Sequence, residues 1–140
     1  MPSSITLPAS ADSLGPLAAW LQDHMALLPV DETWCFALDL AVCEAAANVI
    51  HHALAAEPGR TFTVNFHREE QGVRVALMDA GLAFPAASLY KAQRKIGSDE
   101  ELDLESGRGL MLILQSVDRF SVAREGDRNI TTLVKKYQSA

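Results

Sequence analysis

Apolar side chains recur three and four positions apart in two stretches of the first 55 residues, which is the spacing of amphipathic α-helices. The first stretch follows Pro16, a residue that the first turn of a helix tolerates, and its apolar positions are Leu17, Leu21, Met25 and Leu28. The second stretch begins after Asp31, which suits an N-cap, and continues to about Ala55, before Pro58 and Gly59. We therefore expect two helices, the second longer than the first.

After residue 60 the pattern changes to alternation of apolar and polar positions, which is the period of β-strands. The alternating apolar residues are Phe62, Val64 and Phe66 before the turn EEQG, and Val73, Val75 and Leu77 after it. This predicts a β-hairpin, and the segment DAGLAFP, residues 79–85, ends its second strand. Residues 120–123 and 130–137 around EGDRN predict a second hairpin, and Ile5 and Leu7 indicate an extended segment near the N-terminus.

Residues 91–108 are polar, first basic (KAQRK) and then acidic (DEELDLE). A loop of this length is typical of a lid or a binding segment, and a disordered linker has the same pattern. The segment GRGLMLILQSV then returns to helical spacing, with Gly109 at its start. These elements predict one domain over residues 1–140. Its class is α+β, a two-layer α/β sandwich with a mostly antiparallel sheet and helices on one face.

Composition and charge narrow the class of protein and its partners. Of the 140 residues, 49% are apolar and 21% charged, a balance typical of soluble folded proteins. The formal net charge of −6 argues against a nucleic-acid partner, which needs a basic face on the protein. Cys35 and Cys43 have no CxxC or matching His spacing, so we expect small core residues in a reduced compartment. The N-terminal segment has no signal pattern and no later stretch approaches bilayer-spanning length, so we expect no membrane segment and a cytoplasmic location.

The segment CEAAANVIHH, residues 43–52 of the second helix, places polar side chains among small apolar ones. Glu44 and Asn48 are four residues apart and therefore project side by side, with His52 one turn further. A carboxylate beside an amide oxygen suits Mg²⁺, which usually also touches phosphate, and a partly desolvated Glu44 can accept a hydroxyl proton in phosphoryl transfer. A solvated helix face has the same pattern, so the helix alone leaves both interpretations open.

The two histidines of this segment, His51 and His52, are adjacent. On a helix their side chains diverge by about 100°, so they cannot easily bind one metal ion together. We expect each to be a neutral, hydrogen-bonded side chain at the edge of the core.

Two further clusters combine glycine with polar groups. Asp79 and Gly81 stand at a strand end, where a carboxylate can accept a hydrogen bond from an exocyclic amine such as that of adenine, and glycine lets a ligand approach the backbone. An Asp-Gly turn has the same signature. The segment SGRGL, residues 106–110, places two glycines at a helix entrance, where unpaired N–H groups favour phosphate; a flexible hinge is the equal alternative.

The order of these clusters along the chain is more specific than any one of them. The segments CEAAANVIHHA, LMDAGLAFP and SGRGLMLILQSVD resemble the N-box and the two glycine boxes of the GHKL (Bergerat-fold) ATPase superfamily. Within it, residues 10–137 resemble the anti-sigma factor serine kinases of bacterial partner-switching systems. One departure is Ala83, where GHKL proteins often have a second glycine, and we expect it to restrict the backbone beside the nucleotide.

The resemblance implies ATP and Mg²⁺ as cofactors and a role for each cluster. Asn48 is expected to bind Mg²⁺, Glu44 to act as the general base, and Asp79 with Gly81 to hold adenine. His52 matches the histidine of the family's N-box. The expected triphosphate-binding residues are Gly107, Gly109 and Leu110, together with Arg108, which could instead reach a partner protein.

The resemblance also implies an activity and its partners. The expected function is an ATP-dependent protein serine kinase and anti-sigma-type regulator that phosphorylates a STAS-domain anti-anti-sigma protein. A sigma factor or another regulator is the expected second target, and the family often forms homodimers. The alternative is a nucleotide-binding module without kinase activity that sequesters a sigma factor or other protein, which the presence of Glu44 disfavours.

Overall fold

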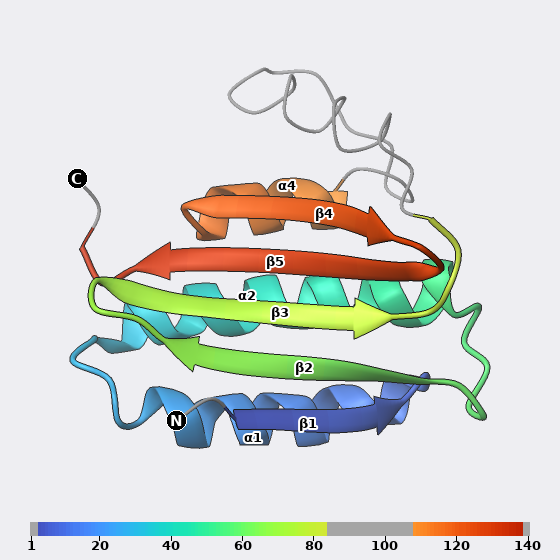
Figure 1. Ribbon diagram of the computed structural model, residues 1–140. Coiled ribbons are helices and arrows are strands. Elements are labelled where there is room, and N and C mark those ends of the chain that lie inside the picture. Colours follow the sequence, from blue (N-terminus) through green and yellow to red (C-terminus); the bar gives the residue numbers. More distant parts are fainter. Residues whose placement is uncertain (1–2, 84–107, 139–140) are drawn as a thin grey trace.

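The computed structural model describes residues 3–83 and 108–138, which form a sheet with helices on one of its faces (Figure 1). The helical elements are a 3₁₀ turn η1 (Ala11–Ser13), α1 (Leu14–Met25), α2 (Glu32–Asn48), a π-helical turn η2 (Val49–Ala53) and α4 (Arg108–Ser116). The strands are β1 (Ser3–Pro8), β2 (Thr61–Arg68), β3 (Gly72–Asp79), β4 (Arg119–Glu125) and β5 (Arg128–Lys136). The predicted α+β class and both hairpins are confirmed.

The five strands lie in the order β1-β2-β3-β5-β4, and every neighbouring pair in this described sheet is antiparallel. The extended segment expected at Ile5 and Leu7 is the edge strand β1, which pairs with β2. In the centre of the sheet, Leu77 lies opposite Val64 on one side, and Val75 lies opposite Leu133 on the other. These apolar side chains are fully buried, so the alternating pattern of the sequence selects the face that the helices cover.

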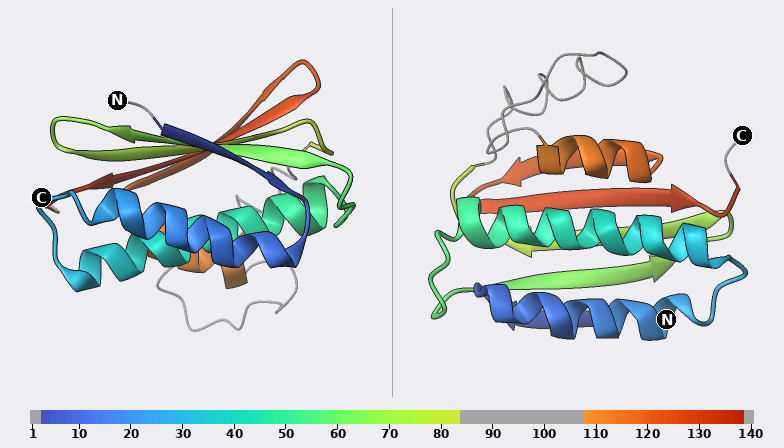
Figure 2. Two further views of the ribbon diagram at one scale, coloured as in Figure 1. Left: turned by 90° about the horizontal axis from the view of Figure 1, so that it is seen from below. Right: turned by 180° about the vertical axis from the view of Figure 1, so that it is seen from behind.

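The helices form the second layer, with α2 lying between α1 and α4 against one face of the sheet (Figure 2). The small residues of α2 lie on its inner side and are at most 2% exposed: Ala41, Ala45 and Ala46. Larger buried side chains from the three helices complete the core, among them Leu17, Leu21, Leu38, Val42 and Ile113. Because alanine side chains are small, they let the axis of α2 lie close to the strands.

Helix α2 begins where the sequence predicts, whereas α1 begins slightly earlier. The N-terminus of α2 is as expected, since Asp31 Oδ1 accepts a hydrogen bond of 2.9 Å from the Trp34 N–H. Helix α1 begins at Leu14, so Pro16 is its third residue and not its first. The preceding 3₁₀ turn, in which Ser10 accepts from Asp12, brings the chain into helical geometry early.

Residues Glu32–Ala53, which comprise α2 and η2, form a 22-residue helical segment that contains an 18-residue window with a mean hydropathy of 1.4, long and apolar enough by length and composition to cross a membrane. The prediction that no stretch approaches this length is therefore wrong. The apolar side chains of this segment pack against the sheet and neighbouring helices, and six residues of α2 are buried: Trp34, Leu38, Ala41, Val42, Ala45 and Ala46. Core packing thus accounts for their apolar character.

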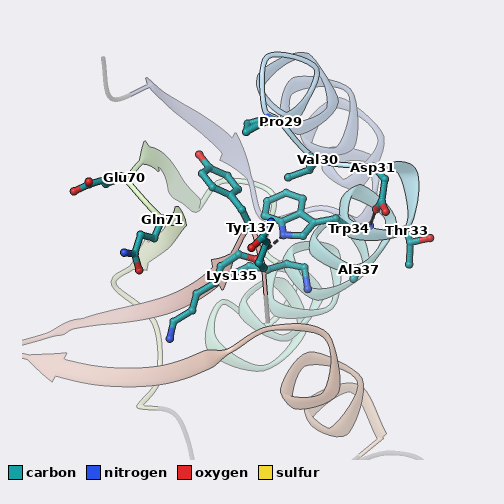
Figure 3. A pocket seen from close by; sticks show the side chains of 12 residues that line it. Pro29, Val30, Asp31, Thr33, Trp34, Ala37, Glu70, Gln71, Lys135 and Tyr137 are labelled. Atoms are coloured by element: carbon teal, nitrogen blue, oxygen red, sulfur yellow. Dashed lines mark hydrogen bonds between the residues drawn. The ribbon is translucent and has the colours of Figure 1, made fainter. Parts of the chain in front are cut away.

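The N-terminal end of α2 is fastened to the end of β5 through Trp34 (Figure 3). The indole Nε1 donates a 2.7 Å hydrogen bond to the carbonyl oxygen of Lys136, and Lys135 Nζ lies 5.7 Å from the indole ring centre. A cavity of about 940 Å³ opens beside these residues, bordered also by Tyr137 and Gln71. Glu44 and Asn48 lie toward the opposite end of the helix, with Asn48 about 21 Å from Trp34 at 1.5 Å per residue.

Candidate functional site

Glu44 and Asn48 lie on α2 where the first turn of α4 crosses it, and both side chains are half-buried. A Cβ atom placed on Gly109 would be 2.9 Å from Glu44 Oε2 and 4.0 Å from Asn48 Oδ1. Only glycine leaves room for this approach without displacing the Glu44 carboxylate. The structure therefore joins the acid–amide pair to the start of the glycine-rich helix, two clusters that lie about 60 residues apart in sequence.

The end of the same helix meets the loop after β3. Beyond Asn48 the helix widens into the π-helical turn η2, in which Leu54 N donates to Val49 O at 2.9 Å. The Ala53 carbonyl is left free to accept a 2.9 Å hydrogen bond from the N–H of Leu82. Gly81 packs so closely on the Ala53 backbone that a Cβ atom would collide with it. The π-helical turn thus serves as the support of the loop, in keeping with the frequent occurrence of such turns at functional sites.

Asp79, the last residue of β3, is 5% exposed, and its two carboxylate oxygens differ in their hydrogen bonds. Oδ1 accepts hydrogen bonds from Gly81 N at 2.8 Å and from Asn129 Nδ2 at 2.9 Å. Oδ2 is buried and has no hydrogen-bond partner within residues 3–83 and 108–138. A buried carboxylate oxygen without a donor is costly, so Oδ2 is suited to accept a hydrogen bond from a ligand that supplies a donor. An exocyclic amine, as in adenine, meets this requirement.

Three side chains secure the loop after Asp79 by its backbone carbonyls. Arg60 Nη2 donates to Ala80 O, Arg124 Nη1 to Gly81 O, and Asn129 Nδ2 to Leu82 O, each at 2.8 Å. No sequence pattern predicted a role in the site for these three side chains. The only sequence signal near Arg124 and Asn129 is the turn EGDRN, residues 125–129, which follows Arg124 and ends at Asn129 and predicts a hairpin and no role in a site.

The other residues that the sequence places near the nucleotide differ in whether the structure describes them and in how far they are buried. Gly107 and the side chain of Arg108 lie outside the described residues, as does most of the expected polar lid. Leu110 is 4% exposed and its side chain belongs to the core, so the expected contact to phosphate requires its backbone N–H. Ala83 is exposed, and it is not among the described residues with positive φ, which are Ala55, Ala56 and Gly126. Its backbone conformation therefore does not require glycine.

His51 and His52 are both exposed on the π-helical turn, so the expectation that they lie at the edge of the core is wrong. Cys35 and Cys43 are partly buried free thiols. Burial, reinforced by the nearby Asp39 carboxylate, raises the pKa of the Cys43 thiol to about 12. Cys43 is therefore a neutral thiol beside Glu44 at physiological pH, which agrees with a packing role.

The described residues contain no group of three or more His, Cys, Asp or Glu side chains that could hold a metal ion. The amide oxygen of Asn48 beside the Glu44 carboxylate is a sparse oxygen donor set. Mg²⁺ is compatible with it, because this ion keeps several waters and takes further oxygens from a bound phosphate. The residues present therefore fit a Mg²⁺ ion that arrives with a nucleotide.

The chain has relatives whose similarity covers most of its length. A family model described as a histidine kinase-like ATPase domain matches residues 7–135. The serine-protein kinase RsbW of Listeria innocua is 29% identical over 102 residues, which are 71% of this chain and 64% of that protein. The chain therefore spans less than two thirds of the length of this curated relative.

Solved structures share the fold at low sequence identity. The structure of the RsbU and RsbW domains of a Mycobacterium tuberculosis protein has a TM-score of 0.68 and 17% identity, over 97% of this chain and 32% of that one. A chain of the SiaB–SiaC complex from Pseudomonas aeruginosa has a TM-score of 0.63 and 16% identity, over 95% and 88%. The histidine kinase AdeS of Acinetobacter baumannii has a TM-score of 0.53 and 12% identity, over 98% of this chain and 68% of that one. The family match shows that the chain belongs to the histidine kinase-like ATPase (GHKL) family, and its similarity to RsbW shows that it resembles the RsbW-like, partner-switching branch.

Proposed function

We propose that this chain is an ATP-dependent protein serine kinase that phosphorylates a STAS-domain anti-anti-sigma protein. The observation that carries the proposal is the convergence of Glu44, Asn48 and Gly109 at the end of α2 that also supports the Asp79 loop. A nucleotide-binding module alone needs Asp79 and an anion-binding helix start. A partly desolvated carboxylate beside that helix start is, in addition, what transfer of a phosphoryl group to a hydroxyl requires.

Each site residue has one task in this proposal. Asp79 Oδ2 accepts a hydrogen bond from the adenine amine, and the N–H groups at the start of α4 bind phosphate oxygens. Asn48 supplies an oxygen ligand to Mg²⁺, and Mg·ATP supplies the phosphoryl group. Glu44 accepts the proton of the serine hydroxyl as the serine oxygen takes the phosphoryl group, and ADP is the other product.

The wider biology follows from the same proposal. In this proposal, residues 1–140 form one domain that works in the cytoplasm. It binds a sigma factor or another regulator when its STAS partner is phosphorylated, and it forms a homodimer. The similarity to RsbW of Listeria innocua supports this assignment.

The test is a phosphorylation assay with purified components. The chain, Mg·ATP and a purified STAS-domain protein are incubated, and the STAS-domain protein is examined for phosphoserine by mass spectrometry. We expect one phosphorylated serine, and none when Mg²⁺ is chelated. Tight ATP binding without phosphoserine would overturn the kinase proposal and favour a module that sequesters its partner.

Replacing Gly109 by alanine is expected to separate stability from nucleotide chemistry. Alanine favours a helix over glycine by up to about 1 kcal/mol, so the melting temperature should stay equal or rise. The added methyl would lie 2.9 Å from Glu44 Oε2, a flexible side-chain end that moves aside at little cost to the fold. We therefore expect phosphoryl transfer to fall by about tenfold or more, since a small misplacement of a catalytic group costs up to about 10²-fold.

Gly15 of α1 provides the matched control for this variant, because a Cβ atom there would meet nothing within 4 Å. Gly15→Ala should show the same helix-propensity gain and an unchanged transfer rate. Equal rates for Gly109→Ala and Gly15→Ala would contradict the placement of Glu44 against the start of α4.

A further inference from the structure

Asn129 and Arg124 form a polar chain that extends from the β4–β5 hairpin to Asp79. In the register of the sheet, Asp79 of β3 lies opposite Asn129 of β5, which lies opposite Arg124 of β4. Arg124 Nη1 donates to Asn129 Oδ1 at 3.0 Å, and Asn129 Nδ2 donates to Asp79 Oδ1 at 2.9 Å. Asn129 is 3% exposed, so its amide exchanges few of these bonds with water.

The surroundings of the Asn129 amide permit only one orientation. Its Nδ2 faces two acceptors, Asp79 Oδ1 and the Leu82 carbonyl, and its Oδ1 faces the guanidinium of Arg124. A flipped amide would place oxygen against both acceptors and N–H groups against a cation. Arg124 therefore helps to fix which way the Asn129 amide points, together with the Leu82 carbonyl, and Asn129 in turn directs a donor at one oxygen of Asp79.

The two donors that the described residues offer to the Asp79 carboxylate reach the same oxygen. Gly81 N and Asn129 Nδ2 bond Oδ1, and the described residues leave Oδ2 as a buried acceptor. A carboxylate held on one side only cannot rotate to offer Oδ1 to a ligand without losing two hydrogen bonds. Its free oxygen therefore has a defined position and a defined character, that of a hydrogen-bond acceptor.

We propose that Asn129 is a positioning residue, oriented by Arg124, that makes Asp79 selective for a purine carrying a 6-amino group over one carrying a 6-oxo group. This inference rests on the proposed function as an ATP-binding protein and adds the residues that determine base selectivity. An amine at that position donates to Oδ2, whereas a carbonyl oxygen would face another acceptor.

The experiment compares the affinities of the whole chain for Mg·ATP and for Mg·inosine triphosphate, which has a carbonyl in place of the amine, by isothermal titration calorimetry. For the unchanged chain we expect ATP to bind about tenfold tighter or more, because a mismatched ligand leaves a charged acceptor unpaired. Asn129→Leu keeps the branched shape and removes the amide, and it should reduce the ratio of the two affinities to about threefold or less. Arg124→Gln, at an exposed residue, should reduce the ratio by a smaller factor.

Leu133→Ala is the control for loss of stability, since Leu133 is a fully buried residue of β5 outside the Asp79 network. It should lower the melting temperature and leave the ratio of affinities unchanged. If Asn129 only supported the fold, Asn129→Leu would weaken the binding of both nucleotides equally. An unchanged ratio in both Asn129→Leu and Arg124→Gln would overturn this inference and leave the kinase proposal intact. Failure of the unchanged chain to bind either nucleotide would overturn the proposed function and this inference together.

Discussion

Replacing Glu44 by glutamine is expected to abolish most phosphoryl transfer while nucleotide binding persists. Glutamine keeps the size of the side chain and its place against Gly109, and it cannot accept a proton from a serine hydroxyl. Loss of a general base typically costs about 10²- to 10⁴-fold in rate. The affinity for Mg·ATP should remain within about threefold, since the general base acts in the transition state and contributes little to binding of the ground state.

The measurement pairs the rate of phosphoserine formation with a calorimetric titration of Mg·ATP. Glu32→Gln is a matched control, because Glu32 is an exposed acid in the first turn of the same helix, at the end away from the site. It should have the transfer rate of the unchanged chain. A normal rate in Glu44→Gln would show that another group accepts the proton, and loss of ATP binding in that variant would show that Glu44 binds the cofactor.

The fold could be predicted from the sequence because its elements have strong periodic patterns and recognisable ends. The Asp31 cap, the alternation in β2 and β3, and the glycines near the start of α4 all have local physical causes. The segment near Ile5 is shorter, and its place at the sheet edge depends on pairing with β2, which no local pattern specifies. The π-helical turn also escaped prediction, because an α-helix and a helix that widens in its last turn have the same apolar content.

That turn also explains why the two histidines were placed wrongly. Helical spacing puts His52 on the same stripe as Glu44 and Asn48 only if the helix remains α-helical beyond Asn48. From Val49 onward the hydrogen bonds span five residues, which changes the direction of each following side chain. Both histidines are exposed as a result.

The candidate site could be predicted only in its separate parts. Glu44, Asn48 and Asp79 were recognisable because an acid or an amide at a helical face or strand end has a definite chemistry. Arg124 and Asn129 are strand residues on either side of the β4–β5 turn, and their roles depend on the sheet register that aligns them with Asp79. Since β3 and β5 are about 50 residues apart in the chain, only the assembled sheet brings these side chains together.

Replacing Asp79 by asparagine is expected to reverse the base preference of the site. The two donors at Oδ1, from Gly81 and Asn129, require the amide oxygen of the new side chain to take that position. Its NH₂ group must then occupy the place of Oδ2 and face the ligand. The amine of a 6-amino purine would then face this NH₂ group, and two hydrogen-bond donors cannot pair. The affinity of the site for the 6-amino purine should fall by about 10- to 100-fold, the usual cost of losing a charged hydrogen bond in a buried site.

A 6-oxo purine should bind this variant better than it binds the unchanged chain, because its carbonyl accepts from the new NH₂ group. Titration of Asp79→Asn with Mg·ATP and Mg·inosine triphosphate measures both changes. Asp127→Asn, an exposed acid in the β4–β5 turn, should alter neither affinity. Because a change that merely weakens the pocket lowers both affinities, an increase for the 6-oxo nucleotide would identify Asp79 as the residue that recognises the base edge. A parallel loss of both would instead indicate that Asp79 acts only through the shape of its loop.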